Sequence, residues 1–104
     1  MNSNTFRKEH QDVLIGIGEG VIKDVVHFRI PPASRCIYVA IVVTRSGNCF
    51  AGTATPSDRD QKLGYTISVG RALRDLVYGS VCFQVDKGLE GRGLRDVCKR
   101  LYCR

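Results

Sequence analysis

Two arginines three residues apart, Arg71 and Arg74, are the side chains in this sequence best suited to hold an anion. Each guanidinium group is a planar fork of donors, which matches the oxygens of a phosphate better than a lysine ammonium does. Arg59 and Lys62 supply two more cations a short distance earlier in the chain. Because helix positions three apart lie on one face, the pattern predicts a cationic surface able to bind phosphate.

Three aromatic side chains, Phe50, Tyr65 and Tyr78, lie near these arginines in the sequence. Aromatic rings can stack on the bases of a nucleotide, and they can equally pack in a core. Arg71 also has an alternative partner in Asp75, which lies four residues further on and could form an ordinary surface ion pair with it. Both interpretations stay open at the level of sequence.

A second group of cations gathers in residues 87–104. Its six basic side chains are Lys87, Arg92, Arg95, Lys99, Arg100 and Arg104. Arg92 and Arg95 repeat the three-residue spacing, so we include them among the candidate ligand-binding residues. The net charge of +6 favours anionic partners in general. A solvated basic face that only aids solubility is the alternative.

Strand-like segments dominate the first half of the chain. Alternating apolar residues predict extended segments at 13–17 and 25–30, joined by a glycine-rich bend, and Pro31 ends the second of them. The run CIYVAIVVT (36–44) is almost continuously apolar and rich in β-branched residues. That composition is typical of the central strand of a sheet.

A hairpin is predicted to follow that central strand. RSGN (45–48) has the composition of a turn, with Gly47 and Asn48 suited to positive φ. The chain then returns as a partner strand over residues 49–55. Gly52 and its small neighbours suggest that another element approaches the backbone of this strand closely.

A long helix is predicted between Ser57, with Asp60 as a weak capping-box partner, and Gly79, a natural stop. The residues expected to face the core at helical spacing are Leu63, Ile67, Gly70, Leu73 and Val77. Glycine costs about 1 kcal/mol relative to alanine inside a helix. Gly64 and Gly70 therefore indicate close packing on the sheet, or room for a ligand or a neighbouring subunit.

The remainder predicts a short edge strand at 81–85, a loop at 87–93 and a short second helix. The apolar residues of that helix are Leu94, Val97, Cys98 and Leu101. The predicted fold is α+β: an antiparallel sheet of about three to four strands, with one main helix and a short C-terminal helix packed on one face. We expect residues 11–104 to form one domain after a flexible segment, 1–10.

Catalytic and cofactor motifs are absent from the sequence. GIGEG (16–20) superficially resembles a nucleotide-binding loop, but it lacks a third glycine at the offset that such a loop requires, and strand-like sequence follows it. The cysteines, Cys36, Cys49, Cys82, Cys98 and Cys103, are odd in number and contain no CxxC. They predict free thiols in a reducing compartment, with a zinc site as a remote alternative. We therefore expect a binding protein that is not an enzyme and that needs no cofactor.

The hydropathy pattern predicts a soluble protein of the cytoplasm with no membrane partner. The first residues lack the apolar region of a signal peptide. The longest apolar run, residues 36–43, is too short to span a bilayer.

The segment GTATPSDRDQKLGYTISVGRAL (52–73) resembles a pattern in small proteins encoded by bacteriophages. In that pattern a strand of small residues leads through a Pro-x-Asp loop and a basic-Leu-Gly stretch into a helix written Ile-Ala-x-Gly-Arg-Ala. The chain departs from it at Arg59 and Asp60, where an aromatic is common, and at Ser68, where alanine is usual. Over about residues 36–78, the chain is similar to phage anti-defence proteins of the Thoeris anti-defence 1 family.

That resemblance implies a homo-oligomer in the host bacterial cytoplasm. Members of the family sequester nucleotide-derived immune signals, here cyclic ADP-ribose isomers or cyclic oligonucleotides, without degrading them. The arginines and aromatics of the loop and helix would then grip phosphate and base at subunit contacts. The short C-terminal helix would be an oligomerisation element.

Two other functions stay open at this level. The predicted β-β-β-α order with basic helices is close to a double-stranded RNA-binding domain, which makes nucleic acid the second expected partner. The leading helix of that fold and the basic cluster that opens its final helix are not found in the sequence. A basic surface could also inhibit a CRISPR or other defence effector by covering an acidic region of it.

Overall fold

The sheet is built around strand β2 (Ile37–Thr44), in which every residue after the first is buried. The computed structural model describes residues 19–30, 37–55 and 61–103. In it, β2 lies between β1 (Ile22–Ile30) and β3 (Asn48–Ala54) and is antiparallel to both. The two-residue β4 (Phe83–Gln84) pairs with the start of β3 and completes the order β1-β2-β3-β4. These strands confirm the predicted central strand, its return partner and the short edge strand.

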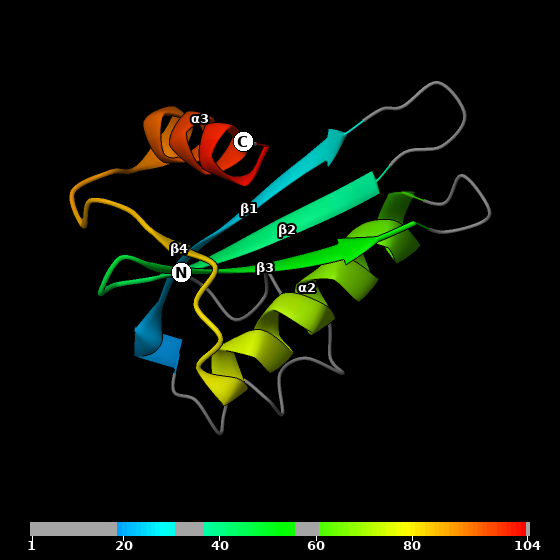
Figure 1. Ribbon diagram of the computed structural model, residues 1–104, viewed down its shortest axis with the longest axis horizontal. Coiled ribbons are helices and arrows are strands. Elements are labelled where there is room, and N and C mark those ends of the chain that lie inside the picture. The colour runs from blue at the N-terminus through cyan, green and yellow to red at the C-terminus, as the bar shows by residue number, and fades with distance from the viewer. Residues whose placement is uncertain (1–18, 31–36, 56–60, 104) are drawn as a thin grey trace.

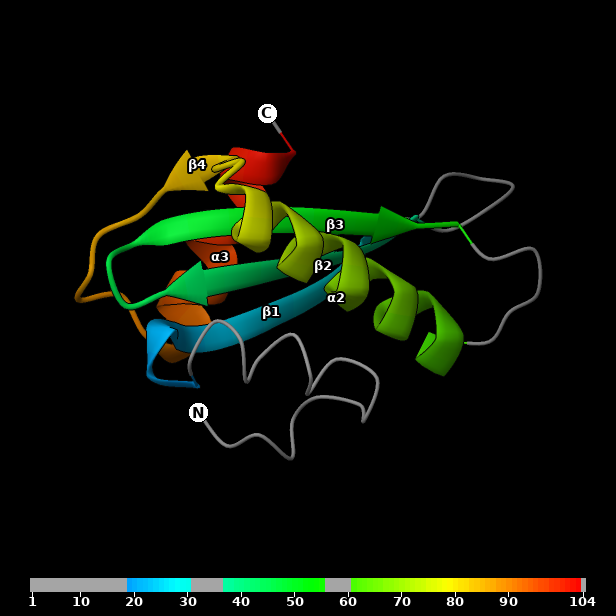
Figure 2. The ribbon, with the colours of Figure 1, turned by 90° about the horizontal axis from the view of Figure 1, so that it is seen from below.

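The two α-helices in the described part of the chain lie on opposite faces of this sheet, as both ribbon views show (Figure 1, Figure 2). α2 (Gln61–Tyr78) covers one face, and α3 (Gly91–Tyr102) covers the other. The α+β fold, its antiparallel sheet, its main helix and its short C-terminal helix are confirmed. The prediction that both helices pack on one face is wrong.

Alternation along the strands explains why both faces need a cover. The cluster under α2 contains Ile22, Ala40, Val42, Phe50, Val69, Ala72 and Leu73. The cluster under α3 contains Val26, Phe28, Val39, Ile41, Val43, Cys49, Leu94 and Cys98. Successive residues of a strand point to opposite faces, so a continuously apolar β2 supplies apolar side chains to both clusters.

The sheet and α2 approach each other most closely at Gly52 of β3. A Cβ atom at this position would overlap the carbonyl oxygen of Ser68 and lie 2.5 Å from the backbone nitrogen of Ala72. At Gly64 of the helix, a Cβ atom would lie 2.6 Å from the ring of Tyr38. The predicted close approach to the return strand is therefore confirmed, and α2 supplies it.

The buried face of α2 differs from the predicted stripe. Leu63 is 42% exposed and Val77 is 58% exposed, although both were expected to face the core. Leu73 is buried as predicted, and beside it the helix turns small residues to the sheet, with Gly64, Ser68 and Ala72 all buried. Helix positions four apart share a face, and the small side chains let the backbone of the helix lie close to the strands.

Glycines with positive φ occupy the hairpin turn and the end of α2. Gly47 has φ of 90°, whereas Asn48 is the first residue of β3 and does not share the positive φ expected for it. α2 stops at Gly79, with φ of 73°, where the Ser80 N–H donates to the Asp75 carbonyl at 2.9 Å. The chain then passes round the edge of β3 to the other face (Figure 1).

Some predictions meet the structure only in part. The 3-10 helix η2 (Glu19–Val21) precedes β1, and the predicted strand at 13–17 lies outside the described residues. So do the helix entry at Ser57 and the flexible segment 1–10. α3 begins at Gly91, inside the predicted loop. In the part of the chain that is described, no helix is long and apolar enough to cross a membrane.

Candidate ligand-binding surface

Arg71 lies on the exposed flank of α2 that borders β3. Its Nη1 donates to the carbonyl oxygen of Thr53 at 2.7 Å. Only Asn48 and Cys49 of β3 pair with β4, so beyond them β3 has no further strand beside it among the described residues. The guanidinium group is thus held at an open strand edge, with its remaining N–H groups available to a ligand.

Arg74 lies one turn further along the same exposed surface of α2. The structure therefore brings the two leading candidates together, as their spacing predicted. The alternative ion pair of Arg71 with Asp75 does not form among the described residues, because the guanidinium group donates to Thr53.

Tyr65 lies on the other flank of α2, beside β1. Its ring centroid is 4.9 Å from that of His27 and 5.1 Å from that of Tyr38, the latter in an edge-on arrangement. Burial lowers the pKa of His27 below its ordinary value, while the nearby Asp24 carboxylate opposes that shift. Because Arg71 borders β3 and Tyr65 borders β1, the two do not face a common pocket.

Phe50 is only 3% exposed and belongs to the core under α2. The interpretation that it stacks on a base is therefore wrong, since the ring is covered by Val69, Leu73 and their neighbours. Tyr78, in contrast, is 75% exposed at the end of α2. Of the aromatics proposed from sequence, Tyr78 offers the most ring surface to a ligand.

Two other candidates cannot be placed. Arg59 lies outside the described residues, and only the backbone of Lys62 is described, within α2. Their contribution to a site beside Arg71 stays a prediction.

Arg92 and Arg95 belong to α3, on the far side of the sheet from Arg71 and Arg74. Both are exposed. A sheet and its two apolar clusters separate the two pairs of arginines, so within one chain they cannot bind the same small ligand. The sequence prediction that grouped them in one site needs correction on this point.

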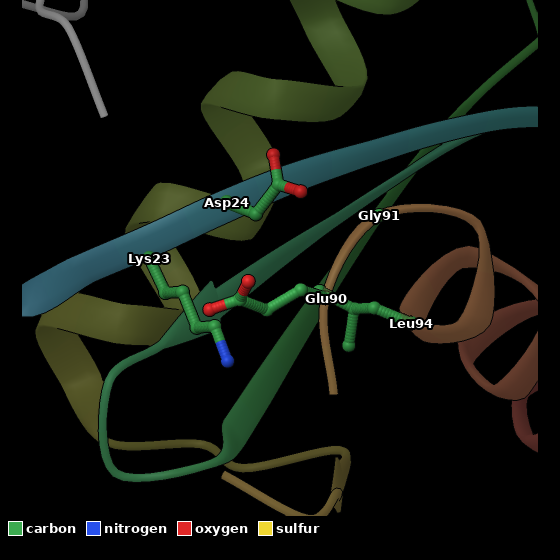
Figure 3. A pocket seen from close by; sticks show the side chains of 5 residues that line it. All are labelled: Lys23, Asp24, Glu90, Gly91 and Leu94. Carbon is green, nitrogen blue, oxygen red and sulfur yellow. The ribbon is translucent and has the colours of Figure 1, made fainter. Parts of the chain in front are cut away.

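A small open recess lies on the α3 face, with a volume of about 220 Å³ (Figure 3). Its lining residues are Lys23, Asp24, Glu90, Gly91 and Leu94. The Lys23 ammonium already donates to the carbonyl oxygens of Lys87 and Leu89, at 2.6 and 2.7 Å. Two carboxylates line the recess, so its charge does not suit a phosphate. The hydrogen bonds of Lys23 hold the loop before α3 against β1.

The described cysteines are all free, as expected. Cys49 and Cys98 are buried between β3 and α3, whereas Cys82 and Cys103 are exposed. A hydrogen bond with Cys98, together with burial, raises the pKa of the Cys49 thiol. Among the described residues, no cluster of His, Cys, Asp and Glu could hold a metal ion. The buried pair thus packs α3 onto the sheet.

Sequence reasoning missed the Thr53 carbonyl, which holds Arg71, and the partners of Tyr65. His27 and Tyr38 carried a weak signal, since both fall in strand segments where an inward polar or aromatic side chain requires a partner. Comparisons with protein-family models, with curated proteins and with solved structures all returned no match.

Proposed function

We propose that this protein is a phage anti-defence binding protein that sequesters a nucleotide-derived signal without degrading it. The ligand would be a cyclic ADP-ribose isomer or a cyclic oligonucleotide, and its phosphates would bind beside Arg71 and Arg74. The proposal concerns one surface only, the exposed side of α2 along the edge of β3.

The observation that carries the proposal is the hydrogen bond from Arg71 to the Thr53 carbonyl at 2.7 Å. A guanidinium group has five donors, so one bond to a backbone oxygen leaves a fork that can still meet a phosphate. The same bond restricts the side chain before any ligand arrives, which lowers the entropic cost of binding. An exposed arginine in an ordinary surface pair would lack this anchoring.

The neighbouring surface of α2 supports an assembly of several copies. Leu63, Val77 and Tyr78 are 42%, 58% and 75% exposed, which is unusual for large apolar side chains on one helix. Arg74 lies between them along the helix, three residues before Val77. A second copy that covered these side chains would place the arginines at the subunit contact and close the open edge into a pocket.

Isothermal titration and native mass spectrometry with cyclic ADP-ribose isomers and cyclic dinucleotides test this function. We expect binding to an oligomer, and release of intact ligand when the complex is denatured. Arg71→Ala should weaken binding by about tenfold or more, because a hydrogen bond to a charged group contributes about 1.5–3 kcal/mol.

Arg29→Ala is the matched control, because Arg29 is an exposed cation of β1 that lies away from the β3 edge. It should bind like the unmodified protein. A monomeric mass together with no heat from any of these ligands would remove the proposal. Equal losses in the two variants would show that total charge, and not the Arg71 site, determines binding.

A further inference from the structure

The exposed surface of α3 carries four cations. Arg92, Arg95, Lys99 and Arg100 are all exposed. Within the described part of the chain, none of the four makes a hydrogen bond or an ion pair. Asp96 is the one carboxylate on the helix. The surface formed by these cations, hereafter the α3 basic surface, is therefore strongly positive, and no described side chain neutralises it.

The placement of two of these cations does not stabilise the helix. Lys99 and Arg100 lie in the last turn of α3, where they interact favourably with the helix dipole. Arg92 lies in the first turn, where the dipole is positive and repels it, and Arg95 lies just after that turn, where the dipole does not stabilise it. The preceding Glu90 occupies the N-cap position but makes no side-chain capping bond. Local helix stability thus accounts for only half of the α3 basic surface.

We propose that the α3 basic surface binds the phosphate backbone of a double-stranded nucleic acid. At about 1.5 Å of rise per residue, Arg92 to Arg100 extend over about 12 Å. A duplex carries one phosphate charge per about 1.7 Å of its axis, so several phosphates lie within reach of this length. Arg92, Arg95 and Lys99 follow one another at three- and four-residue intervals, which gives a nearly straight row of cations.

The chemistry of α3 argues against an anionic membrane as the partner. Leu94 and Cys98 are buried against the sheet, and Val97, Leu101 and Tyr102 are partly covered. The exposed residues of the helix are glycines and charged side chains. Helices that bind a membrane surface insert an exposed apolar face, and α3 has none to offer.

The exposed residues of α3 also argue against a single-stranded nucleic acid as the partner. Proteins that bind single strands stack successive bases on aromatic rings. The aromatic residue of α3, Tyr102, packs edge-on against Phe28 at a centroid distance of 5.9 Å. It is half-buried and so offers no free platform for a base. Cations without aromatics suit the backbone of a duplex, which presents phosphates and hides the faces of its bases.

Fluorescence anisotropy with a labelled duplex of about 20 base pairs, DNA or RNA, tests the proposal. With about three phosphate contacts, affinity should fall by about 40-fold when salt rises from about 50 to about 200 mM. Arg95→Glu should weaken binding by about tenfold and lower the salt slope by about one, because it removes one phosphate contact.

Two further variants sharpen the measurement. Arg29→Glu changes the net charge by the same amount on the face covered by α2, since Arg29 lies opposite Tyr38 across the strands. It should change the affinity by less than about twofold, because exposed charges more than about 10 Å apart are screened at 0.1 M salt. Asp96→Asn removes the one opposing charge of α3 and should tighten binding by a few-fold. All these side chains are exposed, and a circular dichroism melt checks that each variant folds.

Several outcomes would overturn the proposal. One is an equal loss of affinity in Arg95→Glu and Arg29→Glu, which would reduce the effect to net charge. Another is tighter binding to a single strand than to the duplex. A third is binding to vesicles that contain phosphatidylserine, with no binding to either nucleic acid. None of these depends on the α2 surface, so loss of the nucleotide ligand in Arg71→Ala is a separate result.

Discussion

The two faces of the sheet are covered in different ways. α2 lies against its face by backbone contact, with Gly52 and Gly64 at the points of closest approach. α3 is attached by two fully buried side chains, Leu94 and Cys98. In α3, a Cβ atom at Gly93 would meet nothing closer than 3.9 Å.

The two helices therefore differ in how the sheet positions their exposed side chains. Backbone contact fixes the height and rotation of α2, so Arg71 is held in register with Thr53. α3 is held by the buried Leu94 and Cys98, and its exposed cations suit contact with a repetitive backbone that has no fixed sequence. The α2 surface therefore suits a small ligand of defined shape, and the α3 basic surface suits a polyanion.

Gly52→Ala should have the largest effect on the difference between the faces. The new methyl group would collide with the backbone of α2 at Ser68 and Ala72, and backbone cannot move aside as a flexible side chain can. We expect a loss of about 3 kcal/mol in the free energy of unfolding, measured by urea denaturation. Gly20→Ala is the control, because nothing lies within 4 Å of its Cβ position. Equal stabilities would mean that α2 does not touch β3 as described.

Leu94→Ala should have a comparable or slightly smaller effect. This side chain is fully buried under α3, and leucine-to-alanine changes in cores cost about 2–5 kcal/mol. The loss should be concentrated on the α3 side, so amide hydrogen exchange should accelerate in α3 more than in α2. Uniform acceleration in both helices would show that the two faces unfold as one unit.

Gly93→Ala should stabilise the protein by about 0.5–1 kcal/mol, because alanine is the better helix former and the site has room for a methyl group. Thermal denaturation would show it as a small rise in Tm. A decrease would contradict the open space found at the Cβ position of Gly93.

The smallest effect should come from lowering the pH. Burial lowers the pKa of His27 in the folded protein, so the unfolded chain takes up a proton more readily. The stability that the neutral ring contributes is complete above the unfolded pKa of about 6.5 and is lost as the pH falls below it. His27→Gln should flatten urea-denaturation midpoints between about pH 7 and pH 5 relative to the unmodified protein. The same slope in both proteins would assign the acid sensitivity elsewhere.

Much of the fold could be predicted from local sequence. The β2 and β3 strands, the turn at Gly47, the end of α2 at Gly79 and the short β4 follow from residue types at particular positions. The arrangement of helices on both faces could also have been read from β2. Its uninterrupted apolar run implies that both sides of the strand are buried, which one covering face cannot achieve.

The candidate site was less predictable, because contacts between distant segments determine it. Arg71 and Arg74 share a surface, as helical spacing requires, but the bond to Thr53 depends on how α2 lies across β3. Large apolar residues gave the helix face only in part: Leu73 is buried as predicted, but Leu63 and Val77 are exposed, whereas Gly64 and Ala72 are buried. Small residues lie where α2 approaches the strands most closely.

The hydrogen bonds from Lys23 to the loop before α3 join residues 64 and 66 positions apart in the chain. Such distant contacts close a long loop and form slowly compared with the hairpin of β2 and β3. The hairpin and α2 can therefore assemble first, while the opposite apolar cluster waits for the C-terminal helix. During synthesis on the ribosome, α3 cannot cover that cluster until the C-terminal residues have emerged.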